Sequence, residues 1–189
     1  MIELKQPIVL ASKSPRRKSI CELADVPFEV YVIDTDETVN PRLPVEEIPI
    51  AIAVDKMNAV KQQFALYDRT ILAADTIVEL DGHVIGKPKD SEAAIATLQF
   101  LSGRTHRVIT GIALYTPEKT AFFSETTYVT FNILSNEQIA YYVDKYKPYD
   151  KAGAYAIQEW IGAVAIKEIK GDFYNVMGLP IQKVLPLLG

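Results

Sequence analysis

Residues 71–88, with the sequence ILAADTIVELDGHVIGKP, decide the fold. The first ten are mostly apolar or β-branched, a pattern that predicts a buried strand. Asp81 and Gly82 both tolerate a positive φ and therefore predict a two-residue hairpin turn. Residues 83–85 then run back as a second strand, so this stretch predicts a β-hairpin at the centre of the chain.

One carboxylate, Asp75, interrupts the apolar run, with Thr76 beside it. A charged side chain seldom lies in a buried strand unless it is paired or binds a cation. Lys87, in the GKP segment after the hairpin, could return an ammonium group toward that carboxylate. An acid, a hydroxyl and a lysine on one hairpin suggest phosphate and metal chemistry. An Asp75 that only caps neighbouring backbone groups is about as compatible with the pattern.

Length and composition indicate one ordinary globular domain. The chain has 189 residues, of which 49% are hydrophobic and 23% charged. Its net charge of -4 argues against an extended nucleic-acid-binding surface. The single cysteine, Cys21, excludes an intrachain disulfide framework and is typical of a reducing compartment. No apolar run reaches the roughly 20 residues of a membrane span, so we expect a cytoplasmic protein.

Near the N-terminus, residues 8–11 predict a short buried strand that leads into SKSPRR, residues 12–17. Ser14 suits the N-cap and Pro15 the first turn of a helix that should run to about residue 25. Free amide groups and the helix dipole favour an anion there, and Arg16 and Arg17 supply bidentate donors. A helix N-terminus that binds no ligand more often carries acidic side chains in its first turn. We therefore interpret this loop as a phosphate site.

Several further elements follow from periodicity and turn signals. The expected strands cover residues 28–33, 105–115, 120–133 and 163–169, and the expected helices cover residues 50–67, 91–101 and 136–145, with a last, interrupted helix ending near residue 188. Lys56 lies at the edge of the apolar stripe of its helix and could face a cleft, although most such lysines face solvent. Glu37, in an acidic turn, could reach a metal ion beside Asp75; a solvated turn explains that stretch as well.

The stretch 150–158, DKAGAYAIQ, is the second one in which candidate site residues are concentrated. Its glycine permits close backbone approach, and its small residues suit the wall of a pocket. Tyr155, Gln158 and Trp160 could stack on a ligand and hydrogen-bond to it.

Five ordered blocks resemble the Maf-type nucleotide pyrophosphatases over nearly the whole chain. They are LASKSPRR at 10–17, ADTIV at 74–78 with GKP at 86–88, LSGRTHRV at 101–108, DKAGAYAIQ at 150–158 and NVMGLP at 175–180. The SPRR, ADT and IQ pattern resembles the dTTP/UTP-hydrolysing branch. One departure is Glu159-Trp160, where many members have a glycine after the glutamine.

The resemblance implies an α/β fold with an elongated mixed β-sheet flanked by helices, and two lobes around a central cleft, as one domain spanning residues 1–189. It implies hydrolysis of dTTP and UTP to the monophosphate and pyrophosphate, aided by Mg²⁺ or Mn²⁺. Asp75 falls on the family's proton acceptor, and Glu37 falls on its conserved polar cleft. From the chemistry of the residues themselves, we expect Asp75, with Glu37, to hold the metal ion. The family's positions for base recognition fall on Arg16, Thr76 and Gln158. Its conserved polar cleft also includes Ser14, Arg17, Lys56 and Lys87. The family is also linked to septum formation.

The residues alone leave two other classes open, a nucleotide-binding or protein-binding module without turnover and a nucleic-acid-binding module. A carboxylate placed to hold a metal argues against the first, and the missing basic stripe argues against the second. We therefore expect a nucleoside triphosphate as the partner, with no nucleic acid or membrane, and leave a homodimer open.

Overall fold

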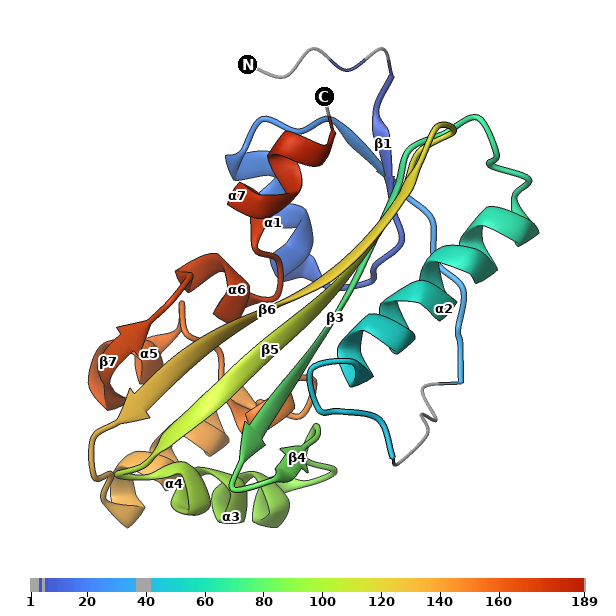
Figure 1. The fold of residues 1–189 in the computed structure, drawn as a ribbon. Coiled ribbons are helices and arrows are strands. Elements are labelled where there is room, and N and C mark those ends of the chain that lie inside the picture. The colour runs from blue at the N-terminus through green and yellow to red at the C-terminus, as the bar shows by residue number, and fades with distance from the viewer. Residues whose placement is uncertain (1–3, 5, 37–41, 189) are drawn as a thin grey trace. The chain divides into compact units, whose positions relative to one another are not determined.

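A computed structural model describes residues 4, 6–36 and 42–188. The elements, in chain order, are β1 (Ile8–Leu10), α1 (Pro15–Leu23), β2 (Phe28–Val30), α2 (Ile48–Gln63), β3 (Ile71–Leu80), β4 (His83–Ile85), α3 (Ser91–Leu101), β5 (Thr105–Tyr115), β6 (Thr120–Phe131), α4 (Asn136–Tyr146), η1 (Ala152–Ala154), α5 (Trp160–Ala165), β7 (Ile166–Lys170), α6 (Phe173–Met177), α7 (Ile181–Val184) and η2 (Leu185–Leu187) (Figure 1).

The strands of the described residues form a seven-stranded mixed sheet in the order β2-β1-β3-β5-β6-β7, and β4 pairs with β3. β1 runs parallel to β2 and β3, whereas the β3–β4 and β6–β7 pairs are antiparallel. The predicted mixed α/β fold is therefore confirmed. The predicted cleft and the single-domain assignment stay predictions.

The chain divides into two compact units, and β3, β5 and β6 contribute residues to both. The first unit comprises residues 1–75, 110–125 and 178–189, and the second comprises residues 76–109 and 126–177. No helix in the described part of the chain is long and apolar enough to cross a membrane.

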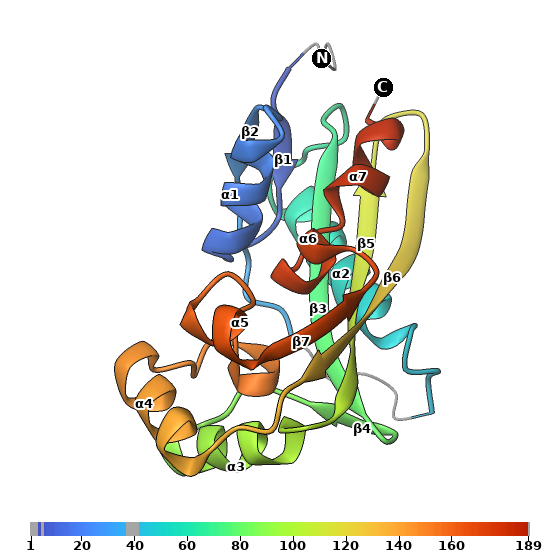
Figure 2. The ribbon, with the colours of Figure 1, turned by 90° about the vertical axis from the view of Figure 1, so that its left-hand side faces the viewer.

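In the first unit, α2 packs on the sheet through the apolar stripe that the sequence predicts. Ala53, Met57 and Val60 are buried against β1 and β3 residues. The helix ends at Gln63, earlier than expected, because Ala65 has a φ of 52° and the amide of Leu66 bonds back to the Lys61 carbonyl at 3.0 Å. That closure is a Schellman motif, built here on alanine rather than glycine. In Figure 2, α1 lies beside β1 and β2.

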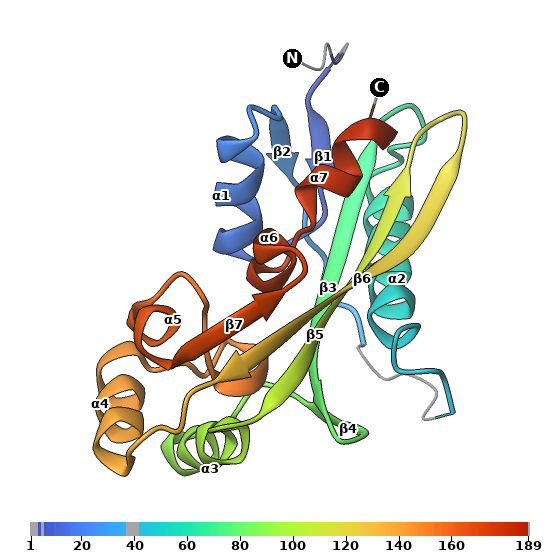
Figure 3. The ribbon, with the colours of Figure 1, turned by 60° about the vertical axis from the view of Figure 1, so that its left-hand side comes forward.

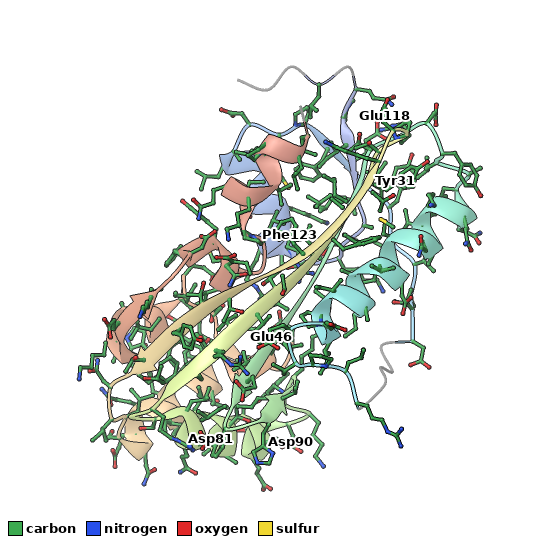
Figure 4. The ribbon with its side chains drawn as sticks, in the orientation of Figure 1. Tyr31, Glu46, Asp81, Asp90, Glu118 and Phe123 are labelled. Carbon is green, nitrogen blue, oxygen red and sulfur yellow. The ribbon has the colours of Figure 1, made fainter. Side chains whose placement is uncertain are left out.

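In the second unit, α3 and α4 lie side by side and share one apolar core with β3, β5 and β6 (Figure 3). The hairpin turn is as predicted, with φ of 52° at Asp81 and 81° at Gly82. Figure 4 labels Asp81 at this turn and Asp90 before α3, where the Asp90 carboxylate accepts the Ala93 amide at 2.8 Å. Ser135 and Gln138 form the predicted capping box of α4.

One predicted strand is partly wrong. Residues 163–165 belong to α5, and β7 begins only at Ile166. The β-branched residues there favour a strand locally, but Ile161 and Ala165, four residues apart, are both buried in the core of this unit. Tertiary packing on one helical face outweighs the local preference.

Candidate active site

Asp75 lies on β3 in the first unit, where it is paired with Lys56 of α2. The Lys56 Nζ donates to the Asp75 Oδ1 at 2.6 Å, and the two side chains are 19% and 15% exposed. Asp75 is therefore no simple backbone cap, and Lys56 does not simply point into solvent. A partly buried carboxylate with a cation at hydrogen-bond distance has a defined orientation, which a proton-accepting group requires.

The loop after β1 follows the same edge of the sheet as Asp75. In the parallel β1–β3 pair, Leu10 is level with Leu72, and the amide of Ala11 bonds to the Leu72 carbonyl at 2.8 Å. The two strands leave this register in the same direction, so residues 11–13 follow Leu10 as residues 73–75 follow Leu72. The carboxyl ends of neighbouring parallel strands are a common place for a ligand site in α/β proteins.

Ser12 organises this loop. The sequence analysis selected Ser14 as a site residue and did not select Ser12. Ser12 is buried, and its Oγ accepts both the Ser14 amide at 3.2 Å and the Arg17 Nη1 at 3.1 Å. Ser14 occupies the predicted N-cap position, but its side chain makes no capping hydrogen bond. The signal in the sequence was two serines in one loop, and only the packing distinguishes their roles.

Arg17 also bonds to the far end of the chain. Its Nε donates to the Gly178 carbonyl at 2.7 Å, within the same unit. Gly178 has a φ of 112°, a conformation that side chains rarely adopt. Arg17 thus ties the NVMGLP block to the SKSPRR loop, and a phosphate contact would use other donors of its guanidinium group. The first turn of α1, where Arg16 is half-buried, carries no acid.

The remaining candidates belong to the second unit. Thr76 is half-buried on β3 next to Asp75, and Lys87 and Gln158 are exposed. Within this unit the amide of Gly153 donates to the Gly86 carbonyl at 3.2 Å, which joins the GKP block to the DKAGAYAIQ block. Gly153 has a φ of 70°, and a Cβ there would lie 2.9 Å from Val78 Cγ2, so this close approach needs glycine.

Tyr155, which the sequence suggested as a ligand contact, has its side chain in the core of the second unit. It is buried, and its hydroxyl forms a 2.8 Å hydrogen bond with His106 Nε2. The His106 and Phe131 rings both contact it edge-on. Burial lowers the pKa of His106 to about 4 and raises that of Tyr155 above its usual range. Tyr155, His106 and Phe131 form an uncharged cluster in the core. The small residues around Tyr155 in the sequence did not predict this cluster.

Glu37 lies outside the described residues. Among those described, no group of three or more His, Cys, Asp or Glu side chains is placed to hold a metal ion. Mg²⁺ is often bound by one or two carboxylates, with substrate phosphates and water completing its coordination. The Asp75 carboxylate, an oxygen donor next to a candidate phosphate loop, has the chemistry that this mode of binding requires.

Comparison with known proteins identifies the family. The family model described as Maf-like protein matches residues 7–189. A dTTP/UTP pyrophosphatase of Parabacteroides distasonis is 49% identical over 95% of this chain and 93% of its own length. The enzymes of that name from Bacillus cytotoxicus and Chlorobium chlorochromatii are 46% and 44% identical, over 94% and 97% of this chain and 91% and 94% of theirs.

One solved structure, of the Staphylococcus aureus Ham1 protein, is similar with a TM-score of 0.46 and 21% identity, over 67% of this chain and 72% of that one. The family match covers nearly every described residue, and the five blocks named above all lie inside it. The chain belongs to the Maf family.

Proposed function

We propose that this chain is a nucleoside triphosphate pyrophosphatase that hydrolyses dTTP and UTP to the nucleoside monophosphate and pyrophosphate. Relatives named for this activity are 44–49% identical to it over at least 94% of its length. Within the structure, the proposal rests on the ion pair between Lys56 and Asp75. Asp75 lies on β3, whose parallel neighbour β1 leads into the SKSPRR loop.

Phosphoanhydride hydrolysis depends mainly on charge neutralisation and on an oriented water molecule. In the proposed mechanism, the amides at the start of α1, with Ser14 and Arg17, bind the phosphate oxygens of the substrate. Ser12 keeps this loop in shape by accepting the Ser14 amide and the Arg17 guanidinium. Asp75 accepts the proton of the attacking water, with its carboxylate oriented by Lys56.

We also propose that Asp75, together with Glu37, holds Mg²⁺ or Mn²⁺. When bound, such a cation neutralises phosphate charge and makes water easier to deprotonate. Lys87 is proposed to bind phosphate. Arg16, Thr76 and Gln158 are proposed to read the base. A glutamine side chain offers one donor and one acceptor, which match the imide edge of thymine and uracil.

The experiment is a product analysis with purified protein, dTTP and Mg²⁺. Attack at the α–β linkage releases pyrophosphate, whereas attack at the γ-phosphate releases orthophosphate. We expect dTMP and pyrophosphate, and a phosphate-detecting assay should therefore respond only when inorganic pyrophosphatase is added. Direct release of orthophosphate would contradict the proposed bond, and binding of dTTP without turnover would indicate a binding module.

A cytoplasmic location is also part of the proposal. Cys21, the only cysteine of the chain, is buried, and burial, with the nearby Glu22 charge, raises the pKa of its thiol to about 11. A protonated, buried thiol is inert, which is compatible with a reducing compartment. The absence of a nucleic-acid partner stays a prediction, and a homodimer stays open.

A further inference from the structure

Gln158 lies at the centre of a tight turn in the second unit. The amide of Glu159 donates to the Ala156 carbonyl at 3.0 Å, which closes a turn with Ile157 and Gln158 as its central residues. Ile157 is 5% exposed and belongs to the apolar core, whereas Gln158 is exposed. The turn therefore anchors one central side chain in the core and leaves the next one available to a ligand.

The turn packs directly against the start of α5. The Gly162 amide donates to the Glu159 carbonyl at 2.9 Å, and a Cβ on Gly162 would lie 1.7 Å from the Ile157 carbonyl oxygen. No side chain fits there, so the backbone of α5 at Gly162 packs directly against the backbone of the turn at Ile157. This contact limits the movement of Ile157, but it does not hold the two ends of the turn together.

A buried tyrosine of α4 holds both ends. Tyr142 is fully buried, and its hydroxyl donates to the Glu159 carboxylate and accepts the Ala156 amide at 3.3 Å. Burial raises the pKa of Tyr142 above its usual range, and the hydrogen bond to Glu159 raises it further. The hydroxyl therefore stays protonated and keeps its donor. α4 and α5 lie next to each other in Figures 2 and 3, and the Tyr142 ring stacks with Trp160 of α5 at 6.4 Å.

Lys151 supplies the charge that the Glu159 carboxylate needs in this setting. The Lys151 Nζ lies 3.5 Å from Glu159 Oε1 and 2.8 Å from Asp150 Oδ1, and the Lys151 side chain is only 9% exposed. A partly buried carboxylate without a cation would be costly. Glu159, whose side chain is 23% exposed, is thus held from one side by Lys151 and from the other by Tyr142.

We propose that Tyr142 is a positioning residue for base discrimination, because its hydroxyl joins the residues on both sides of Gln158 and fixes how the turn presents that side chain. The inference rests on the proposed function, in which Gln158 reads the pyrimidine. A donor–acceptor contact discriminates only while its geometry is held, so a loosened turn should accept wrong bases more readily. Glu159 and Lys151 contribute indirectly, because Glu159 accepts the Tyr142 hydroxyl and Lys151 pairs with Glu159.

Tyr142→Phe tests this directly, because it removes the hydroxyl and keeps the ring. Tyr146→Phe is the matched control. Tyr146 lies one turn further along α4 and stacks on Tyr142 at 4.9 Å, but its hydroxyl makes no hydrogen bond within the described residues. For each protein, kcat/KM is measured with dTTP, UTP and CTP by pyrophosphate release. We expect the dTTP-to-CTP ratio to fall about five- to tenfold in Tyr142→Phe, the effect of one hydrogen bond. The ratio should be unchanged in Tyr146→Phe.

The fall should come mainly from a higher KM for dTTP, since a base contact made in both ground and transition states leaves kcat nearly unchanged. Amide hydrogen exchange of residues 154–160 should be faster in Tyr142→Phe than in the wild type. If Tyr142→Phe does not fold, Glu159→Gln, which keeps the size of the side chain but removes the charge that pairs with Lys151, should also lower the ratio.

The outcomes separate the two proposals. If the wild type releases pyrophosphate and prefers dTTP, and Tyr142→Phe and Glu159→Gln keep the wild-type ratio, the inference is overturned and the proposed function stands. Equal falls in Tyr142→Phe and Tyr146→Phe would show that the effect does not depend on the hydrogen bonds of the Tyr142 hydroxyl, and would also overturn the inference. If the wild type hydrolyses no triphosphate, the proposed function fails and the specificity role fails with it.

Discussion

At the scale of single residues, Asp75 and Lys56 form a partly buried pair, and the sequence candidates Arg17 and Ser14 meet in a loop organised by Ser12. These contacts give the predicted site residues separate tasks. The Asp75 carboxylate is held by Lys56, as the proposed role of proton acceptor requires, whereas Arg17 is partly committed to Gly178 and Ser12. Substitution at Asp75 therefore tests chemistry, and substitution at Arg17 would also disturb the packing of the C-terminal segment.

Asp75→Asn keeps the shape of the side chain and removes its charge. We expect kcat for dTTP to fall by at least about 10²-fold, the effect of losing a general base, while the protein still folds. Asp144→Asn is the control, because Asp144 is an exposed carboxylate that also pairs with a lysine, Lys147, outside the proposed site. Steady-state kinetics and circular dichroism measure both effects. Near wild-type turnover in Asp75→Asn would rule out the assigned role.

His106 makes stability depend on pH. Its pKa is lowered from 6.5 to about 4 by burial, and its Nδ1 has no hydrogen-bond partner in the described part of the chain. Between these two values the unfolded chain binds a proton that the folded protein does not, so the free energy of unfolding should fall as pH drops from about 6.5 to 4. The loss should reach about 3 kcal/mol, at 1.36 kcal/mol per unit of pKa.

Urea denaturation of the wild type and of His106→Gln between pH 7 and 4 measures this contribution. The stability of the variant should decline less steeply over that range, and His83→Gln, at an exposed residue of β4, should behave like the wild type. Parallel curves for the wild type and His106→Gln would show that another group causes the acid sensitivity.

At the scale of elements, β5 and the start of α2 approach each other in the first unit without any side chain between them. A Cβ on Gly111 would lie 2.2 Å from the carbonyl carbon of Pro49 and 2.3 Å from the amide nitrogen of Ile50. Both contacts are with backbone, which cannot rotate away. The position of α2, and with it the position of Lys56, therefore depends on a glycine in β5.

Gly111→Ala should destabilise the protein by about 3 kcal/mol or more, as expected for overpacking against rigid backbone. Gly82→Ala is the comparison, because a Cβ there meets nothing within 4 Å and the φ of 81° alone costs about 1 kcal/mol. The free energy of unfolding is measured with urea. Equal losses in the two variants would show that α2 can shift to accept the methyl group.

At the scale of the whole molecule, the proposed functional residues are spread over both compact units. Ser14, Arg16, Arg17, Lys56 and Asp75 belong to the first, and Thr76, Lys87 and Gln158 belong to the second. The family match from residue 7 to residue 189 spans both units. Substrate preference is therefore a property of the full chain and should be measured on it.

We expect the full chain to hydrolyse dTTP and UTP faster than CTP, and all three faster than ATP. Cytosine reverses the donor and acceptor pattern at two of its three edge positions, which would leave polar groups of the site unpaired. A purine is also larger. The measurement is kcat/KM for the four nucleotides under one set of conditions. Equal values would show that the site does not read the base, although pyrophosphate release could still hold.

The sequence predicted those parts of the fold whose causes are local. The Asp81-Gly82 turn follows from two residues that tolerate positive φ, and the Ser135–Gln138 capping box satisfies helix amides with neighbouring side chains. The apolar stripe of α2 follows from helical periodicity. The ordered family blocks gave the family itself and the residues worth testing.

Only the tertiary structure decided the contacts between residues far apart in the chain. The pairing of Lys56 with Asp75, the bond from Arg17 to Gly178 and the burial of Tyr155 against His106 have no local signal. The same holds for α5, whose β-branched residues favour a strand until Ile161 and Ala165 find a core to pack against. Propensities and turn chemistry act over a few residues, whereas burial and long-range hydrogen bonds depend on which surfaces the folded chain brings together.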